Sequence, residues 1–439
     1  MKNLCIAHLV LSGLLCFHGT SLAQNEALSI DTLTVESAID IALSHQPLLQ
    51  AADAGVAASE AGKRLALSTY WPQISFSASG THTEGTFVFN PSIPARNQIY
   101  STYTTGLTAN QMIYDFGKTA SRVGATTDLV TASKQDYRLT RDAVATNAEV
   151  AFYAAMQAGE LKTVNEETVK QTEDHLRSAR AFYSVGTRPL LDVTRAEVDV
   201  ANANVGLIQA RNAQRVALLQ LENAMGVHLK AGYVLKGHVN ISPVTFLLDS
   251  ARTVAMSNRP DILSARAHYE ALSSFASAAW GLHLPTLSAT GTYNWSGFDV
   301  NLYGRWTAGL TFSLPIFQGF GINAQVDQAD AAAQAQLAQV RSIIENAMLD
   351  VEQNYLSVQE AAERIAATSK LVEQADESLR LAEKQYAAGV GTAIEVTDAQ
   401  VVRANARITA IQAIYDHTIA LTRLKQSMGT MNAEKNNGQ

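Results

Sequence analysis

The chain carries one long sequence pattern twice, at an offset of 203 residues. The stretch "FYSVGTRPLLDVTRAEVDVANANVGLIQA" (182–210) recurs as "QYAAGVGTAIEVTDAQVVRANARITAIQA" (385–413). Between 181 and 226, 17 of 46 residues are identical to their counterparts in the second copy. This agreement is several times the chance level, so the chain must fold into two similar halves.

Both copies extend upstream of this stretch, with one difference in length. Pro47 and Pro72 of the first copy correspond to Pro260 and Pro285 at an offset of 213, whereas the offset from Gly106 onward is 203. The ten additional residues of the first copy therefore lie between Pro72 and Gly106. Because loops tolerate insertions best, we expect a longer loop there.

Prolines mark the boundaries of the predicted helices. A proline inside a helix breaks it, and the chain has no proline between 94 and 189 and none after 315. The stretch 324–386 contains neither glycine nor proline and is rich in helix-forming Ala, Gln and Glu. A helix of about 65 residues is about 100 Å long, which is far beyond the length of an ordinary globular helix.

The predicted layout repeats itself. The first repeat (24–226) is expected to contain helices at 34–70, a β-hairpin at about 72–114, a long helix at about 117–184 and a return helix at about 189–226. The second repeat (251–429) is expected to contain helices at 251–283, a β-hairpin at about 285–317, a long helix at about 321–387 and a return helix at about 392–428. Residues 227–250 connect the repeats, and 430–439 form a polar tail.

The long helices have few large apolar side chains. Seven alanines stand among Gln and Asp between 324 and 338. A helix packed on a solid core has one broad face of Leu, Ile and Val. Narrow seams of alanine instead fit a cylinder that is one helix thick, with water on both sides. An ordinary long coiled coil is the alternative that these residues leave open.

Short segments beside the prolines show the period of two that is typical of β-strands. After Pro285, apolar residues alternate with Ser, Thr and Asn, and 74–79, 103–110 and 305–314 alternate in the same way. One apolar face and one small polar face is what a membrane β-barrel with a wet lumen requires. All four tryptophans lie in or beside these segments, as in aromatic girdles at a bilayer edge.

The number of strands points to an oligomer. A soluble sandwich is the other reading, but it needs more than the four strands that the sequence provides. Four strands cannot close a barrel around a lumen, and an open sheet edge in lipid leaves backbone groups without hydrogen bonds. If these strands lie in a membrane, several chains must contribute them.

The N-terminus is predicted to be a secretory signal peptide at 1–23. Lys2 precedes the apolar run "LCIAHLVLSGLLCF", and "SLA" fits a cleavage site before Gln24. Both cysteines, Cys5 and Cys16, lie in this segment, so the exported chain is expected to have no disulfide and no cysteine metal site. No later stretch of 18 apolar residues predicts a transmembrane helix.

The remaining composition argues against several classes of function. A formal net charge of −7 does not favour nucleic-acid binding. The ten histidines lack metal-ligand spacing, and neither a G-x-S-x-G motif nor a P-loop is present. We therefore expect no enzyme activity, no cofactor and no metal.

Taken together, these features resemble the TolC family of Gram-negative outer-membrane efflux channels. The resemblance rests on the export signal, the duplicated hairpin and long helix, and the turns "FYSVGTRPLLDV" and "YAAGVGTAIEVTDAQ". It implies a mainly α fold with membrane β structure: a homotrimer with a 12-stranded β-barrel, four strands per chain, continued by a 12-helix α-barrel. It also implies an outer-membrane location in contact with lipid, with a periplasmic adaptor protein and an inner-membrane transporter as partners.

The resemblance also implies a closable mouth at the turns that face the periplasm. Glu395 and Asp398 match the acidic rings of that entrance, and three residues apart on a helix they share a face. Tyr386 matches the tyrosine of the closing link, and Asp192 matches its acidic partner.

A further set of residues lies in the turns themselves. As turn or adaptor contacts we expect Gly186, Thr187, Arg188 and Gly389. One departure concerns the closing link. Where the family pattern has an arginine, this chain has Gly391, and the first copy has Arg188 instead. For Glu395 and Asp398 the residues alone also fit a solvated helix start, because acids favour a helix N-terminus.

The favoured function is a passive exit duct of a tripartite efflux pump that carries small molecules across periplasm and outer membrane. A duct for type I protein secretion is the alternative with the same fold, since the pump selects the cargo. A trimeric coiled-coil adhesin or envelope structural protein is a third reading, which leaves the two β-hairpins unexplained.

Overall fold

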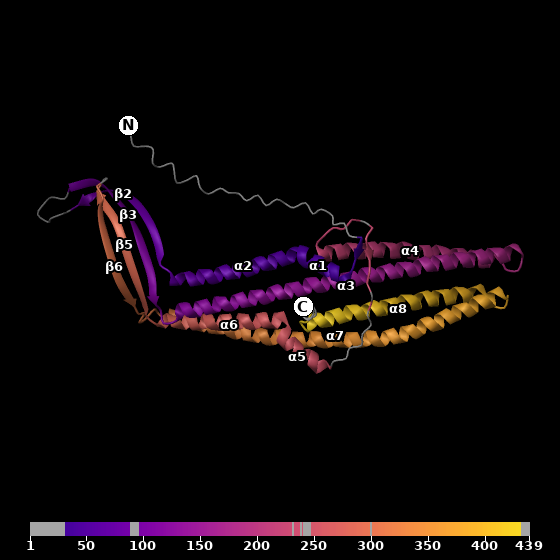
Figure 1. Cartoon of the computed structure of the whole chain (residues 1–439). Coiled ribbons are helices and arrows are strands. Elements are labelled where there is room, and N and C mark those ends of the chain that lie inside the picture. Colours follow the sequence, from indigo (N-terminus) through magenta and orange to yellow (C-terminus); the bar gives the residue numbers. More distant parts are fainter. Residues whose placement is uncertain are drawn as a thin grey trace, which may run out of the picture.

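The structure is a computed structural model that describes residues 31–87, 96–230, 232–237, 239, 247–298 and 301–431. The predicted signal peptide at 1–23 and most of the polar tail lie outside these residues. The chain is strongly elongated, with a β-sheet at one end and two helical turns at the other (Figure 1).

Each half of the chain contains the same succession of elements. The first half consists of α1 (Val35–His45), α2 (Pro47–Leu67), β2 (Gln73–Phe87), β3 (Arg96–Tyr114), α3 (Lys118–Ser184) and α4 (Leu190–Met225). The second consists of α5 (Leu248–Asn258), α6 (Pro260–Trp280), β5 (Thr286–Phe298), β6 (Tyr303–Ser313), α7 (Gly321–Ala387) and α8 (Ala393–Ser427). Short 3-10 turns, Ser68–Tyr70 and Gly281–His283, join α2 and α6 to their strands.

Two helices run through most of the length of the molecule. α3 and α7 have 67 residues each, which corresponds to about 100 Å. Each changes neighbours near its middle. The helices form a wall that is one helix thick. Near the sheet they lie side by side in the order α2, α3, α6, α7 (Figure 1). Near the turns, α3 contacts α4 and α8, and α7 contacts α8.

Local signals explain where the shorter helices begin and end. Pro47 and Pro260 occupy the first position of α2 and α6, where a missing N–H has no cost. The return helices α4 and α8 end next to Gly226 and Gly429, which are equivalent positions of the two repeats. Both glycines have a φ of 70°, a left-handed conformation that ends a helix.

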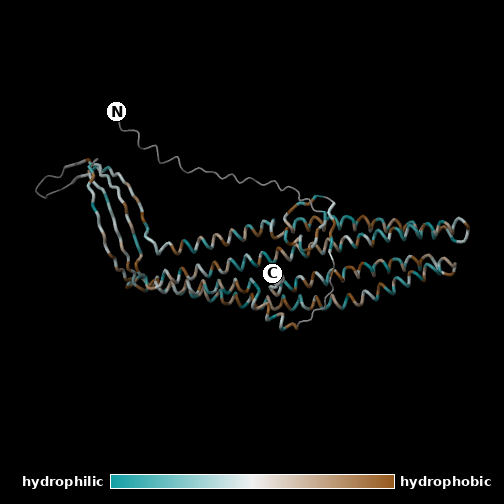
Figure 2. The backbone as a smooth tube through the Cα atoms, viewed as in Figure 1, coloured by the Kyte–Doolittle hydropathy of each residue, from teal (hydrophilic) through white to brown (hydrophobic). Residues whose placement is uncertain are grey.

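The wall is thin, and small side chains fill its seams. The fully buried residues of the long helices include Ala125, Ala132 and Ala148 in α3 and Ala347 in α7. Along these helices hydrophobic and hydrophilic residues alternate over short distances, without a long apolar run (Figure 2). Among the described residues, no helix combines the length and apolar composition needed to cross a membrane.

The largest hydrophobic cluster lies near the middle of the molecule. There Phe152 of α3 and Leu221 and Met225 of α4 pack around Leu33 and α1. Leu33 belongs to a two-residue strand, β1 (Thr32–Leu33), which pairs in parallel with β4 (Val234–Leu235). The sequence predicts only a connection at 227–250 and gives no sign of this pairing, because two residues show no period.

The four long strands form one antiparallel sheet in the order β2-β3-β5-β6. Its register places Phe76 opposite Leu107, Leu107 opposite Tyr293, and Tyr293 opposite Trp306. This apolar row crosses the whole sheet, and its four side chains are exposed in the single chain. The opposite face carries mainly small polar residues, such as the row of Ser75, Thr108, Thr292 and Thr307. The outer edges of β2 and β6 have no strand partner among the described residues.

The central pairing of the sheet joins the two repeats. β3 belongs to the first repeat and β5 to the second, and Gly106 lies opposite Asn294. A Cβ at Gly106 would collide with the Asn294 side chain and the Tyr293 carbonyl, so this seam requires glycine. β2 and β3 have 15 and 19 residues, against 13 and 11 in β5 and β6. Part of the additional length of the first hairpin therefore extends the strands, not only the loop.

Candidate gate at the helical turns

The two turns at the far end of the molecule have the same backbone geometry. One connects α3 to α4, and the other connects α7 to α8. Gly186 and Gly389, at equivalent positions, have φ angles of 76° and 82°. Their N–H groups donate to the carbonyl oxygens of Tyr183 and Tyr386, at 2.9 and 3.1 Å. A left-handed glycine after the last helical turn is the usual way to end a helix, so these glycines are explained by the turn itself.

The second turn continues into α8 through a capping box. The Thr392 side chain accepts a hydrogen bond from the Glu395 N–H at 3.3 Å, and Oε2 of Glu395 accepts one from the Thr392 N–H at 2.8 Å. Pro189 stands at the equivalent position of the first turn and has no such side chain. Glu395 therefore stabilises the start of α8 in addition to any role at an entrance.

Only the second repeat presents two acids at this end of the molecule. Glu395 and Asp398 are both exposed on the first turns of α8. Their counterparts in the first repeat are Asp192, which is buried, and Arg195. The exposed pair is available to a neighbouring chain or to solutes, as an acidic ring requires. Its placement in a ring stays a prediction.

Arg188 connects the two turns. Its Nη2 donates to the carbonyl oxygen of Gly391 at 2.9 Å and to that of Tyr386 at 3.3 Å. Its guanidinium carbon lies 4.7 Å from the centre of the Tyr386 ring. A Cβ at Gly391 would lie 3.0 Å from atoms of Gln385 and Tyr386, so a side chain there would require these neighbours to shift. The arginine of the first repeat thus contacts the backbone where the family pattern has its own arginine.

Tyr386 is the centre of the contacts between the turns. Its side chain is 4% exposed, whereas the equivalent Tyr183 is 46% exposed. The ring lies 5.3 Å from His175 and 5.8 Å from Phe182, centre to centre. Burial raises the pKa of Tyr386, the charge of Asp192 adds to this effect, and Arg188 opposes it. We call Arg188, Tyr386 and Gly391 the clasp.

The predicted link between Tyr386 and Asp192 is not a hydrogen bond in the single chain. The buried Tyr386 hydroxyl has no hydrogen-bond partner among the described residues. Asp192 is near enough to act on Tyr386 through its charge. The link stays a prediction for other states of the protein.

Sequence reasoning missed two further contributions to this region. His175 of α3 is buried behind Tyr386; burial lowers its pKa, and the charges of Asp199 and Asp192 counteract this. The Thr397 hydroxyl of α8 donates to Oδ2 of Asp199 on α4 at 2.9 Å, a second connection between the repeats. Neither contact has a sequence signal, because the partners are far apart along the chain and belong to no motif.

The predicted turn contacts occupy different environments. Gly186, Thr187 and Gly389 are exposed at the end of the molecule, whereas Arg188 is half-buried in the clasp. No group of three or more His, Cys, Asp or Glu side chains suited to a metal ion occurs in the described ranges. The turns therefore combine an exposed end surface with a buried contact between the two helical hairpins.

Comparisons with known proteins agree with this architecture. The family described as "Outer membrane efflux protein" matches residues 38–227 and 252–430, once in each repeat. The outer membrane efflux protein BepC of Brucella suis is 25% identical over 448 residues, covering 99% of this chain and 91% of BepC. The outer membrane protein TolC of Escherichia coli is 26% identical over 397 residues, covering 84% and 76%.

Solved structures show the same fold. The outer membrane protein VceC of Vibrio cholerae superposes with a TM-score of 0.80 at 20% identity, covering 90% of this chain and 96% of VceC. The CmeC outer membrane channel of Campylobacter jejuni gives a TM-score of 0.78 at 18% identity, covering 92% and 88%. The expected mainly helical fold with a small sheet is thereby confirmed. The chain belongs to the outer membrane efflux protein family, and its location is the outer membrane.

Proposed function

We propose that three copies of this chain form a passive exit duct of a tripartite efflux pump. The observation that carries the proposal is the sheet. Its apolar row from Phe76 to Trp306 is exposed, and the edges of β2 and β6 are unpaired among the described residues. Pairing β6 of one chain with β2 of the next satisfies both edges and gives a closed barrel whose apolar face meets lipid.

The helical part supports the same assembly. The wall is one helix thick, and α4 at its edge exposes Val198, Val205 and Leu219, which follow one another at multiples of seven residues. Such a stripe is suited to packing against a helix of a neighbouring chain. Two similar hairpins per chain then give six turns around one mouth, which accounts for the duplication.

The mouth is the proposed entrance from the periplasm. Glu395 and Asp398 of three chains bring six carboxylates together, which favours cations. Val185 and Val390 at the ends of the turns are 70% and 81% exposed. With Gly186, Thr187 and Gly389 they form an apolar end surface suited to a periplasmic adaptor protein, which in turn connects the duct to an inner-membrane transporter. Relatives of this chain are named as efflux proteins, which supports the transport of small molecules over the adhesin alternative.

The test is single-channel recording of the purified trimer in planar bilayers. The variant Glu395→Gln with Asp398→Asn removes both charges, and glutamine keeps the capping box. We expect the preference for cations over anions, read from the reversal potential in a salt gradient, to fall. The matched control is Asp327→Asn with Asp330→Asn, an exposed acid pair of the same spacing near the sheet end of α7.

Each outcome decides a different part of the proposal. Unchanged selectivity in the tip variant removes Glu395 and Asp398 from the entrance and leaves the duct. A folded, trimeric parent protein that forms no pore contradicts the duct itself.

A further inference from the structure

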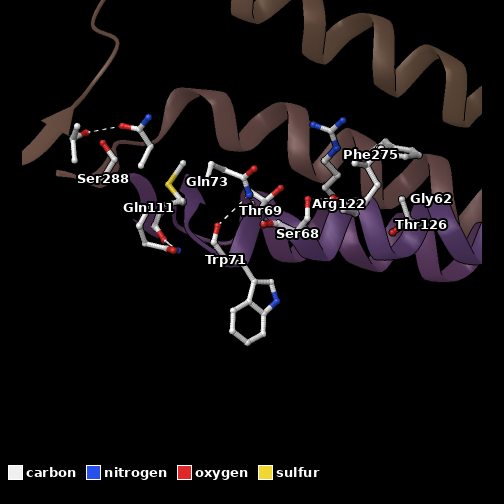
Figure 3. A pocket seen from close by; sticks show the side chains of 15 residues that line it. Gly62, Ser68, Thr69, Trp71, Gln73, Gln111, Arg122, Thr126, Phe275 and Ser288 are labelled. Carbon is white, nitrogen blue, oxygen red and sulfur yellow. Dashed lines mark hydrogen bonds between the residues drawn. The ribbon is translucent and has the colours of Figure 1, made fainter. Parts of the chain in front are cut away.

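A cavity of about 740 Å³ lies where the sheet meets the helices (Figure 3). Residues of α2, α3 and α6 and of strands β2, β3 and β5 line it, so both repeats contribute. Its volume is within the range of small-molecule sites. It is far from the clasp and lies at the other end of the molecule (Figure 1).

The sheet supplies the polar side of this cavity. Gln73, Asn110 and Thr290 lie opposite one another on neighbouring strands and therefore share one face. That face is opposite to the row of Phe76, Leu107 and Tyr293. In the proposed duct the polar face is the wall of the lumen, so the cavity is open to solutes in transit.

The helices supply apolar surface and one charge. Leu65 and Ala66 of α2 and Phe275 of α6 line the cavity together with Arg122 of α3. Figure 3 shows the Arg122 side chain beside Phe275. Arg122 is the one charged residue of the lining, and within the described part of the chain its guanidinium has no acidic partner. A cation next to apolar surface, without a nearby carboxylate, is complementary to an anion with an apolar body.

Hydrogen bonds hold the wall in place. The Gln73 amide donates to the carbonyl oxygens of Ser68 and Trp71, at 3.0 and 3.2 Å. The Thr290 hydroxyl donates to Oδ1 of Asn110 at 3.0 Å. These contacts fix the turn between α2 and β2 against the sheet, so the cavity is formed before a solute arrives.

We propose that this cavity is a binding site for small amphipathic organic anions, with the anionic group at Arg122 and the apolar body against Leu65, Ala66 and Phe275. The inference rests on the proposed duct, because it places the polar face of the sheet in the lumen. The site gives the duct a point of transient contact with cargo near its exit.

The test uses two fluorescent probes that differ in one group. 8-Anilinonaphthalene-1-sulfonate carries a sulfonate, and N-phenyl-1-naphthylamine has the same aromatic body without it. Binding is measured on the full trimer in lipid nanodiscs, with empty nanodiscs as background. The variants are Arg122→Gln, which removes the charge, and Gly62→Phe, which fills the cavity. A Cβ at Gly62, which lines the cavity, meets no atom within 4 Å, so the larger side chain has space to enter.

We expect Arg122→Gln to weaken sulfonate binding about tenfold, the effect of losing one hydrogen bond between charged groups, and to leave the neutral probe unchanged. Gly62→Phe should weaken both. Arg138→Gln is the matched control, because Arg138 is an exposed arginine on the same helix outside the cavity; it should bind both probes as the parent does.

Equal sulfonate binding by the parent and Arg122→Gln overturns the inference, as does binding that Gly62→Phe leaves unchanged. Conductance measurements on the same preparations test the duct independently of the binding site. Pores without Arg122-dependent binding contradict the site alone. Arg122-dependent binding without pores contradicts the duct and leaves an anion site on the sheet.

Discussion

Replacing Arg188 by glutamine tests whether the clasp holds the two helical hairpins together. The guanidinium donates to two carbonyl oxygens, at 2.9 and 3.3 Å, and lies 4.7 Å from the Tyr386 ring. One hydrogen bond from a charged group contributes about 1.5 kcal/mol at the lower end of its range, and the cation–π contact about 0.5 kcal/mol at a partly exposed site. On our proposal that the clasp belongs to the closed mouth, the closed state should lose about 2 kcal/mol per protomer in Arg188→Gln, a shift of about 30-fold toward open.

The assay is the open fraction of single channels in planar bilayers at fixed salt. Arg180→Gln is the matched control, because Arg180 pairs with Glu197 at 2.8 Å between α3 and α4 of the same hairpin. That pair does not connect the two turns, so its loss should leave the open fraction unchanged. An Arg188→Gln channel that closes as the parent does refutes the clasp.

Tyr386→Phe separates the clasp from the predicted link to Asp192. The Tyr386 hydroxyl is buried and has no hydrogen-bond partner among the described residues. A clasp that uses the ring and the backbone should therefore keep its closed fraction in Tyr386→Phe. A large rise in the open fraction would show that the hydroxyl bonds Asp192 in the closed trimer, and that the predicted link is the stronger lock.

Three further predictions concern single positions. His417 of α8 is fully buried, and neither ring nitrogen has a hydrogen-bond partner in the described part of the chain. Burial lowers the pKa of His417, so the unfolded chain takes up its proton first, and stability is lost as pH falls below about 6.5. In His417→Leu the melting temperature should depend less on pH below about 6.5, and the free energy of unfolding should rise by about 1 kcal/mol. An unchanged pH dependence would show that His417 is not the group responsible. Thr392→Ala should lower the free energy of unfolding by about 1 kcal/mol through the lost cap and increase hydrogen exchange at the start of α8. The control Thr194→Ala, beyond the first turn of α4, should not change hydrogen exchange at the start of α4. Gly391→Ala should open channels as Arg188→Gln does, because its Cβ crowds Gln385 and Tyr386; normal closure would show that the turn adjusts.

The sequence was sufficient for the architecture because the architecture depends on local signals. Long runs without glycine or proline predict α3 and α7, alternation predicts the strands, and the prolines predict the starts of α2 and α6. The capping box of α8 can also be predicted from the sequence, since Thr392 and Glu395 have the T-x-x-E spacing.

The clasp could not be predicted from the sequence, because it depends on packing between segments about 200 residues apart. Arg188 was assigned to the exposed turn on its position alone, whereas the structure turns its side chain toward Tyr386 and Gly391. Tyr183 and Tyr386 occupy equivalent positions of the two repeats, yet one is exposed and the other buried. Equivalent positions differ because one contact between two turns can bury only one of the two rings.

The seam between β3 and β5 has a consequence for how the protein is made. Gly106 pairs with Asn294, so the sheet cannot be completed until most of the chain has left the ribosome and been exported. Until then the β3 edge of the first hairpin stays unpaired, and pairings of such long sequence separation form slowly. An unpaired, apolar strand is prone to aggregation during this interval. Production of the protein should therefore depend on holding the first half in solution until the second half arrives.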